Sequence, residues 1–260
     1  HNKMKLRDIY IVSQEGLDPR VNKAAVEAIS DMMDCFPNYK DKYPITNLGA
    51  WKDPKGYRHI EDGHIYLDEY KSTKWHIEKA RKRARQEGRP NQLNANELLN
   101  TMRTDPTNLQ IPQFTIVLTK DDLYPNKDMR YCLGIGSEGL GCVVSAYRYS
   151  DANGKLVDIE NFKTVLMHEF GHVIELTYEG RKNSVEMLGP HCADENGLCI
   201  MQQRVNGDYS YITRARIEAK KMGLPPICPD CVEAGNKFFG REYGRVCVME
   251  AKRDFGINRR

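Results

Sequence analysis

Two histidines four residues apart, His168 and His172, with Glu169 directly after the first, form the pattern HExxH. On a helix, positions four apart share one face, so the two imidazoles can bind a single Zn²⁺. Glu169 can then reach a water on the metal and serve as its general base. The apolar neighbours Val165 and Ile174 can anchor such a helix in a core. The competing interpretation is a buried helix whose histidines are only hydrogen-bonded.

A catalytic zinc typically takes three protein ligands and leaves the fourth position to water. His191 is the only histidine after His172, and it is therefore the first candidate for the third ligand. A downstream carboxylate, Glu186 or Glu195, is the alternative. The spacing of the residues alone leaves both arrangements open.

Of the eight cysteines, four cluster between residues 192 and 231, and they predict a second metal site. Cys228-x-x-Cys231 is a good half-site for tetrahedral zinc, because two thiolates can hold one ion from a tight turn. Cys192 and Cys199 would complete a Cys₄ set, although two disulfides or inert buried thiols are alternatives. The other cysteines have no ligand spacing, and we expect them to be buried structural residues: Cys35, Cys132, Cys142 and Cys247.

The composition narrows the class of protein. Of the 260 residues, 40% are hydrophobic, enough for a core, and 29% are charged, which is ordinary for a soluble protein. No apolar run approaches the roughly 20 residues that span a bilayer, so we expect no membrane partner. A net charge of +3 is too small to imply nucleic-acid binding, and the basic run 79–89 is interpreted as a solvated helix face. We expect a monomer, with a cytoplasmic location favoured and an exported, trimmed chain left open.

The elements that must position these residues follow from periodicity and turn residues. Runs rich in β-branched residues predict strands at 5–12, 114–118 and 141–149, and a hairpin within 59–70. Gly134-x-Gly136-x-x-Gly139 matches a dinucleotide motif, but a strand follows it, which argues against that function. Apolar spacing predicts helices at 21–33, 72–86, 96–102, 157 onward through the HExxH pattern, and 209–222 as the last sizeable helix.

The ordered set of His, Cys and Met residues resembles the archaemetzincins, zinc metalloproteases of the metzincin clan. The set is His168-Glu169-x-x-His172, His191-Cys192, Cys199-x-Met201 and Cys228-x-x-Cys231, and the resemblance covers about 112–231. It implies an α/β (α+β) metzincin-like fold with a mixed twisted sheet and an active-site helix. It also implies two zinc ions, a catalytic one on His168, His172 and His191 with Glu169 as base, and a structural one on Cys192, Cys199, Cys228 and Cys231.

The resemblance further assigns Met201 to a tight turn beneath the catalytic zinc. It favours His191 over a glutamate as third ligand, because Cys192, Cys199 and Met201 follow in the family's order. The substrate, a peptide or protein, would lie as an added strand along 141–149. The chain would form one catalytic domain, 1–260, with an upper part at about 1–190 and a smaller lower part at about 191–260.

Two departures from the family pattern bear on the site. The family has glycine three residues after the second histidine, where this chain has Glu175, and eighteen residues separate His172 from His191. We therefore expect a longer active-site helix, to about Tyr178, followed by a returning loop. Cys192 and Cys199 are also further apart than in the family. A displaced third ligand would favour a non-catalytic zinc protein that binds peptides or a protein partner. Tyr209 and Tyr211 are the candidates for stabilising an oxyanion.

Overall fold

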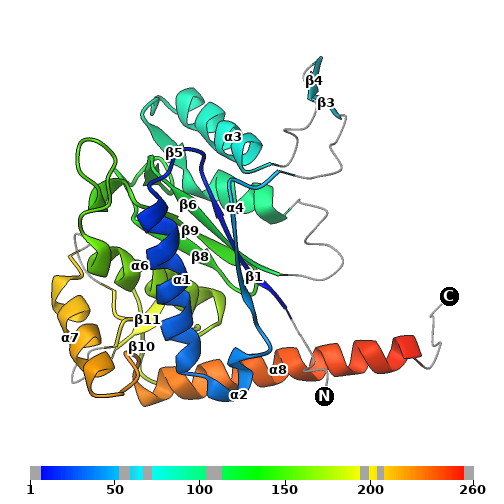
Figure 1. Ribbon diagram of the computed structural model, residues 1–260, viewed down its shortest axis with the longest axis vertical. Helices are drawn as coiled ribbons and strands as arrows, with labels where there is room; N and C mark the ends of the chain where they lie inside the picture. The colour runs from blue at the N-terminus through cyan, green and yellow to red at the C-terminus, as the bar shows by residue number, and fades with distance from the viewer. Residues whose placement is uncertain are drawn as a thin grey trace.

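The computed structural model describes residues 7–52, 59–61, 63–66, 72–103, 113–193, 199–203 and 208–254, with the backbone alone for 59–61, 66, 102–103 and 245–254. Figure 1 shows a sheet with helices on both faces. The strands are β1 (Ile9–Ser13), β2 (Ile45–Gly49), β3 (His59–Glu61), β4 (His64–Tyr66), β5 (Gln92–Asn94), β6 (Phe114–Thr119), β7 (Asp122–Tyr124), β8 (Gly134–Ser137), β9 (Gly141–Ser145), β10 (Ser184–Glu186) and β11 (Pro190–Cys192). The helices are α1 (Pro19–Asp34), α2 (Pro37–Lys40), α3 (Thr73–Gln86), α4 (Ala95–Arg103), the 3₁₀ turn η1 (Tyr147–Tyr149), α6 (Ile159–Val173), α7 (Ser210–Lys221) and α8 (Pro229–Asp254).

The main sheet has five strands in the order β2-β1-β6-β9-β8. The first four are parallel, and β8 pairs with β9 in the antiparallel direction. The predicted mixed α/β fold is therefore confirmed. The strand at 141–149 is shorter than expected and lies inside the sheet, so the expectation that substrate adds to it is wrong. β8 is the edge strand on that side.

Alternating side chains of the strands build a core on each face of the sheet. Ile116 of β6 and Val144 of β9 point into the larger core, which α1 and α6 cover. Val117 and Val143 point into the smaller core beneath α3 and α4. The HExxH pattern thus lies on a helix that packs directly on the sheet (Figure 1).

The longest helix of the described residues, α8, was not predicted, and the expectation that 209–222 would be the last sizeable helix is wrong. Glycines at 235, 240 and 244 disfavour a helix locally, but tertiary packing overrides this preference. A Cβ on Gly235 would lie 2.3 Å from the ring of Phe36, so the glycine permits close approach. Phe239 then packs on Phe36 and Tyr43 with ring centroids 5.2 and 4.9 Å apart.

The remaining expectations about elements hold in type, with shifted ends. The segment 59–66 forms the hairpin β3–β4, while 67–70 lies outside the described residues. Ser72 caps α3, because its hydroxyl accepts a hydrogen bond of 3.2 Å from the N–H of Trp75. Within the basic run, Arg81 pairs with Asp121 at 2.8 Å and Arg83 with Glu87 at 2.6 Å.

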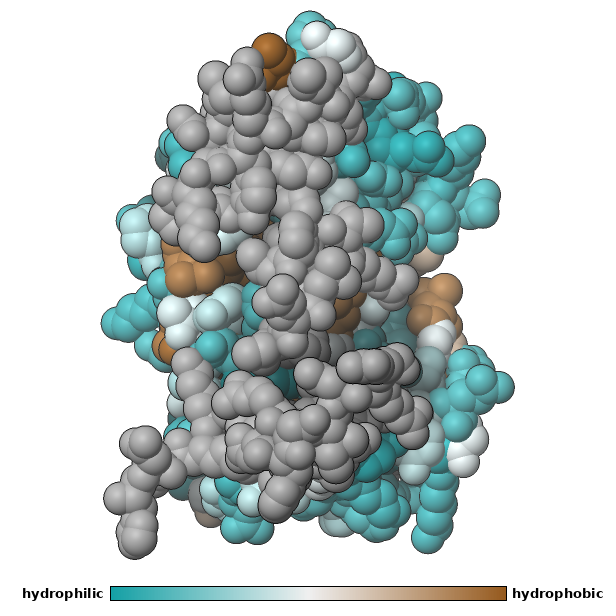
Figure 2. All heavy atoms as spheres, turned by 90° about the vertical axis from the view of Figure 1, so that its right-hand side faces the viewer, coloured by the Kyte–Doolittle hydropathy of each residue, from teal (hydrophilic) through white to brown (hydrophobic). Residues whose placement is uncertain are grey.

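The described surface on the face seen in Figure 2 is mostly hydrophilic, with small separate apolar patches. Among the described helices, none has the length and apolar character to cross a membrane. The division of the chain near residue 190 into an upper and a lower part stays a prediction.

Candidate metal centre and catalytic cleft

Helix α6 presents the HExxH pattern from its buried second half. Asp158 caps the helix, its carboxylate accepting from the N–H of Asn161. His168, Glu169 and Phe170 are buried against the core, and His172 is half-buried. The Nε2 atoms of His168 and His172 lie 3.2 Å apart, so the two imidazoles meet at one point.

The helix ends at Val173, and the expected extension to about Tyr178 is wrong. Glu175 has a φ of 52°, in the left-handed region that glycine adopts most easily. The N–H of Leu176 donates to the carbonyl of Gly171 at 2.9 Å, and that of Glu175 to His172 at 3.2 Å. These two bonds form a Schellman C-cap. Glu175 therefore ends the helix as the family's glycine would, at a conformational cost.

The third histidine arrives on a hairpin in which β10 pairs with β11. Val185 lies opposite His191, whose ring centroid is 5.1 Å from that of His168 and 4.8 Å from that of His172. The structure brings the ligand atoms of the three histidines within 4.8 Å of one another. Glu186 is an exposed residue of β10 and is not in this group, and Glu195 lies outside the described residues.

Each imidazole is oriented by an oxygen atom at Nδ1, which leaves Nε2 for the common point. The partners are the carbonyl of Ile200 at 2.7 Å from His168, the hydroxyl of Thr177 at 3.3 Å from His172, and the carbonyl of Gly189 at 2.9 Å from His191. Such partners commonly orient metal-binding histidines. The sequence had not revealed them, because they come from chain segments distant from α6 or from turn geometry.

The electrostatics favour neutral imidazoles, the form that binds metals. Burial lowers the pKa of His168 to about 4. Burial likewise lowers the pKa of His172 and of His191. The spacing also fits zinc, because nitrogens about 2.0–2.1 Å from a tetrahedral ion are ~3.3 Å apart, close to the 3.2 Å between His168 and His172. The three residues therefore fit a zinc ion with one position left for solvent.

Strand β8 packs against α6 at Glu169, the general-base candidate. A Cβ on Gly134 would lie 2.8 Å from Cγ of Glu169, and one on Gly136 would lie 2.5 Å from the Glu169 carbonyl oxygen. These two glycines allow the edge strand to pack closely against α6. The Gly134-x-Gly136 part of the dinucleotide-like motif therefore has a packing role. Burial raises the pKa of Glu169 to about 8, opposed by the N–H of Gly136, which donates to the carboxylate.

Met201 packs against α6 next to the histidine pair, and its assignment to a turn beneath a catalytic zinc stays a prediction. It is fully buried, and its Sδ would be 2.2 Å from a Cβ on Gly171, the residue before His172. Its carbonyl accepts from the N–H of Cys192 at 2.9 Å. Met201 thus packs on the bare helix backbone between the two α6 histidines.

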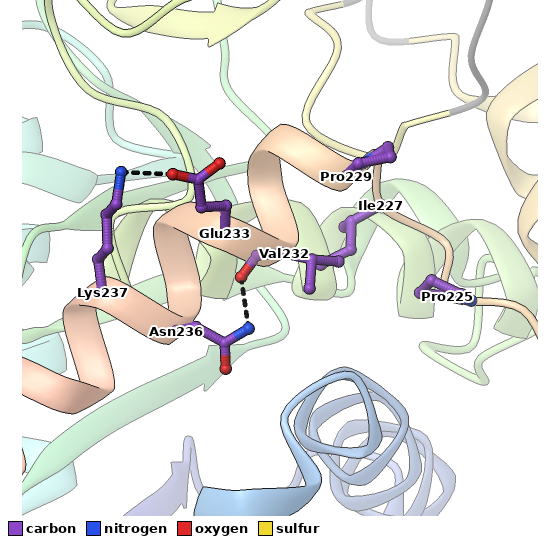
Figure 3. Close-up of a pocket in the computed structure, with 7 residues that line it drawn as sticks. All are labelled: Pro225, Ile227, Pro229, Val232, Glu233, Asn236 and Lys237. Carbon is purple, nitrogen blue, oxygen red and sulfur yellow. Dashed lines mark hydrogen bonds and ion pairs between the residues drawn. The ribbon is translucent and has the colours of Figure 1, made fainter.

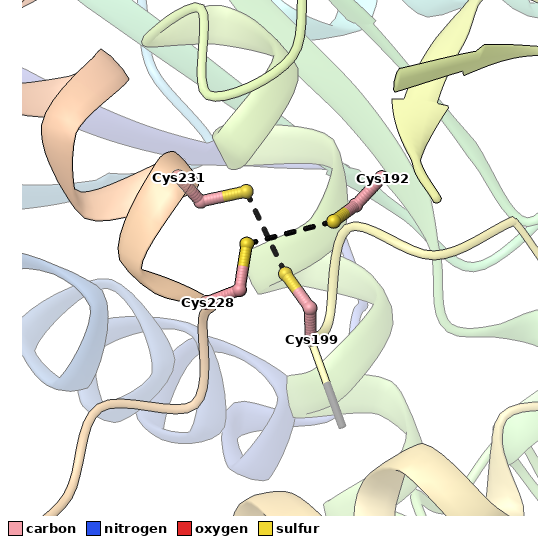
Figure 4. A group of neighbouring side chains, drawn as sticks. All are labelled: Cys192, Cys199, Cys228 and Cys231. Atoms are coloured by element: carbon pink, nitrogen blue, oxygen red, sulfur yellow. Dashed lines mark hydrogen bonds between the residues drawn. The ribbon is translucent and has the colours of Figure 1, made fainter. Parts of the chain in front are cut away.

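The four predicted cysteines converge in a second cluster, with all sulfur atoms within 4.8 Å of one another (Figure 4). The sulfurs of Cys192 and Cys228 are 3.5 Å apart, and those of Cys199 and Cys231 are 3.6 Å apart. Sulfurs about 2.3 Å from a tetrahedral zinc are ~3.8 Å apart, so the cluster has nearly the size that zinc needs. The wide gap between Cys192 and Cys199 does not prevent this convergence.

A buried arginine, which sequence reasoning missed, contacts this cluster. Arg181 is 7% exposed, and its Nη1 donates to the sulfur of Cys231 at 3.5 Å. Burial acts to lower the pKa of Arg181, but negative charge on Cys231 and Cys192 outweighs it and leaves that pKa raised. A buried guanidinium beside neutral thiols would be a costly unpaired charge. Hydrogen bonding among the sulfurs raises the pKa of Cys199 and of Cys231. Thiolates in this cluster therefore need compensating positive charge, of which Arg181 supplies part and a bound dication would supply the rest.

The histidine group opens into a cleft of about 690 Å³. The cleft is lined by α4, the segment 125–133, β8, α6 and the tip of the β10–β11 hairpin. Tyr209 lines it, with its ring 5.5 Å from that of His168, whereas Tyr211 is exposed and does not.

The cysteines outside the cluster divide. Cys142 is buried as expected, but Cys35 and Cys132 are only half-buried. Cys132 lines the cleft, so the expectation that it is buried is wrong, and its structural role stays a prediction. The side chain of Cys247 lies outside the described residues.

A second pocket, also about 690 Å³, lies along the first turns of α8 (Figure 3). Ile227 and Val232 give it an apolar lining, and Glu233 and Lys237 pair with each other beside it. The pair joins the only charged groups in the described lining, and the described lining holds no histidine or cysteine. The chemistry is therefore concentrated in the histidine cleft.

Comparison with solved structures supports this assignment of the fold. The chain is similar to the archaemetzincin of Methanopyrus kandleri, with a TM-score of 0.51 and 18% identity, over 90% of this chain and 96% of that one. The fold is that of an archaemetzincin. The expected resemblance is thereby confirmed at the level of the fold.

Two further solved structures are similar at lower scores. They are an archaemetzincin of Archaeoglobus fulgidus complexed with malonate (TM-score 0.43, 19% identity, 87% and 99% of the two chains) and a zinc-dependent peptidase of Methanocorpusculum labreanum (0.46, 16%, 87% and 99%). No protein-family model matches the sequence, and no curated protein matches it.

Proposed function

We propose that this chain is an archaemetzincin-like zinc peptidase that hydrolyses peptide bonds. The observation that carries the proposal is the convergence of His168, His172 and His191 on one point in a cleft that also contains Glu169. The archaemetzincin fold supports it independently, since the M. kandleri structure covers nearly the whole chain. Zinc would also bind the four cysteines, giving two ions per chain.

The residues of the cleft divide the work of the reaction. A zinc ion held by His168, His172 and His191 would supply Lewis acidity, the chemistry that polarises a peptide carbonyl and lowers the pKa of water towards neutrality. Glu169 takes the proton of the attacking water and passes it to the leaving nitrogen. Tyr209 donates a hydrogen bond to the developing oxyanion. The substrate lies along the free edge of β8, beside Glu169.

The decisive experiment separates metal binding from catalysis. We expect about two zinc ions per chain by elemental analysis, falling to one in the double variant His168→Ala/His191→Ala. Glu169→Gln should keep both ions and lose about 10²–10⁴-fold in peptide cleavage, because only the general base is removed. Glu186→Ala, on the exposed strand of the hairpin, is the matched control and should change neither. An unchanged zinc content in the double variant, or full activity of Glu169→Gln, would overturn the proposal.

The same assay decides between removal of terminal residues and internal cleavage. Matched peptides with free and acetylated amino termini are digested, and the products are identified by mass spectrometry. An aminopeptidase cleaves only the free form, whereas an endopeptidase cleaves both. A peptide-binding protein without catalysis would bind both and cleave neither.

A further inference from the structure

The tip of the β10–β11 hairpin carries an exposed leucine at the mouth of the cleft. Leu188 is 72% exposed, the most exposed large apolar side chain among the described residues. It lines the same cleft as His168 and Glu169. Isolated exposed leucines are ordinary on protein surfaces. A leucine at the mouth of a cleft with polar side chains, however, can contact a ligand bound in that cleft.

The backbone at this leucine is strained. Leu188 has a φ of 57°, and Gly189 follows with a φ of 108°. A leucine in the left-handed region is uncommon, because its Cβ crowds the following carbonyl. Glycine would satisfy the turn without that crowding, as Gly189 does next to it. Strain of this kind is typically concentrated at functional positions.

Part of the remaining cleft lining is apolar and can complement an apolar side chain. Leu99, Leu133 and Ile135 line it from α4, the preceding segment and β8, together with Met129. Of the described lining residues, none is lysine or arginine, and the carboxylates are those of Glu138 and Glu169. Leu188 therefore adds to an apolar lining from the side of the chain that also supplies His191.

The distance along the chain limits which part of a substrate Leu188 can contact. It precedes His191 by three residues, so their Cα atoms are at most about 10 Å apart. When a peptide bond lies at the histidine group, a residue within one or two positions of that bond can therefore reach Leu188, which lines the same cleft.

We propose that Leu188 is a specificity-determining residue that binds a large aliphatic or aromatic side chain of the peptide substrate next to the scissile bond. The inference rests on the proposed peptidase function and adds the substrate class. It also gives the long spacing between His172 and His191 a role, since the hairpin that bridges it brings both the third histidine and this contact.

The test compares Leu188→Gly with the control Met187→Ser. Glycine suits the positive φ, so this variant should melt at or above the temperature of the wild type. Met187 is 45% exposed in the same turn but does not line the cleft.

Each zinc-loaded protein digests a mixture of proteome-derived peptides, and the cut sites are read by mass spectrometry. We expect Leu, Ile, Met and Phe to be enriched at one flanking position in the wild type and in Met187→Ser. In Leu188→Gly, the enrichment of these residues at that position should be about tenfold lower.

A parallel measurement does not depend on turnover. In the Glu169→Gln background, the dissociation constant of a labelled peptide with leucine at the flanking position should rise about tenfold on Leu188→Gly. That of its serine counterpart should not change. The inference would be overturned if the apolar preference persists in Leu188→Gly. It would also be overturned if the wild type cleaves peptides without any apolar preference. In both cases the peptidase proposal stands. A wild type that cleaves nothing would instead defeat the peptidase proposal and leave this binding measurement to judge Leu188.

Discussion

Glu175 shows how one residue can end a helix against its own preference. Its left-handed conformation completes the Schellman cap that turns the chain away from α6 directly after His172. The carboxylate also pairs with Arg241 of α8. Both partners are partly exposed, so the pair contributes at most about 1 kcal/mol. The backbone cost of the left-handed conformation, about 1–2 kcal/mol, is of similar or larger size.

Substitution at Glu175 can separate these two effects. Glu175→Ala loses the ion pair and keeps the backbone cost, whereas Glu175→Gly loses the ion pair and relieves it. We therefore expect the glycine variant to be more stable than the alanine variant by about 1 kcal/mol, or about 2–4 °C in melting temperature. Thermal unfolding followed by circular dichroism measures the difference. An alanine variant as stable as the glycine variant would mean that the left-handed turn does not form in solution.

At the scale of elements, the HExxH helix and its two histidines could be predicted because a period of about four residues fixes their common face. Residue type and spacing made His191 and the four cysteines candidates for convergence, with alternatives left open, and the order of residues in a known family favoured that arrangement. The end of α6, the β10–β11 hairpin and Arg181 could not be predicted. Each depends on a contact between distant segments or on a conformation that the residue disfavours.

Arg181 connects the hairpin segment to the cysteine cluster. Its side chain donates to Cys231 of α8, and its backbone carbonyl accepts from the hydroxyl of Ser184 in β10 at 2.7 Å. Arg181 therefore connects the start of the hairpin that carries His191 and Cys192 to the cysteine cluster. Four thiolates around a dication leave two negative charges, which one guanidinium reduces to one.

We expect Arg181→Met to weaken zinc binding at the cysteines by about 10–100-fold, because it removes that charge and its hydrogen bond but keeps the bulk. Competition with a chromogenic chelator measures this affinity. The His168→Ala/His191→Ala background leaves only the cysteine site to report. Lys182→Met, an exposed neighbour, is the control and should have no effect. An affinity unchanged in Arg181→Met would show that the guanidinium only fills space.

For the whole molecule, the two candidate metal sites differ in how much of the chain they join. The cysteine cluster ties the end of β11 and the turn of Met201 to the start of α8, whose Phe238 and Phe239 pack in the larger core. The histidine group joins one hairpin to a helix that already packs on the sheet. Stability should therefore depend mainly on the cysteine site, and activity on the histidine site.

Cys231→Ala tests this division, because alanine keeps the helix of α8 and removes one thiolate. Breaking a buried charged cluster costs about 3–5 kcal/mol, so we expect the melting temperature to fall by roughly 10 °C or more. His172→Ala, which abolishes the half-buried ligand on a rigid helix, should lower it by only a few degrees while ending peptide cleavage. Cys142→Ala, a buried thiol outside the cluster, is the control for lost packing alone and should cost about 1 kcal/mol.

Treatment of the wild type with a strong chelator should reproduce the effect of Cys231→Ala, and a thiol reductant alone should not. If the reductant lowers the melting temperature and the chelator does not, the cysteines are disulfides and the cluster holds no metal.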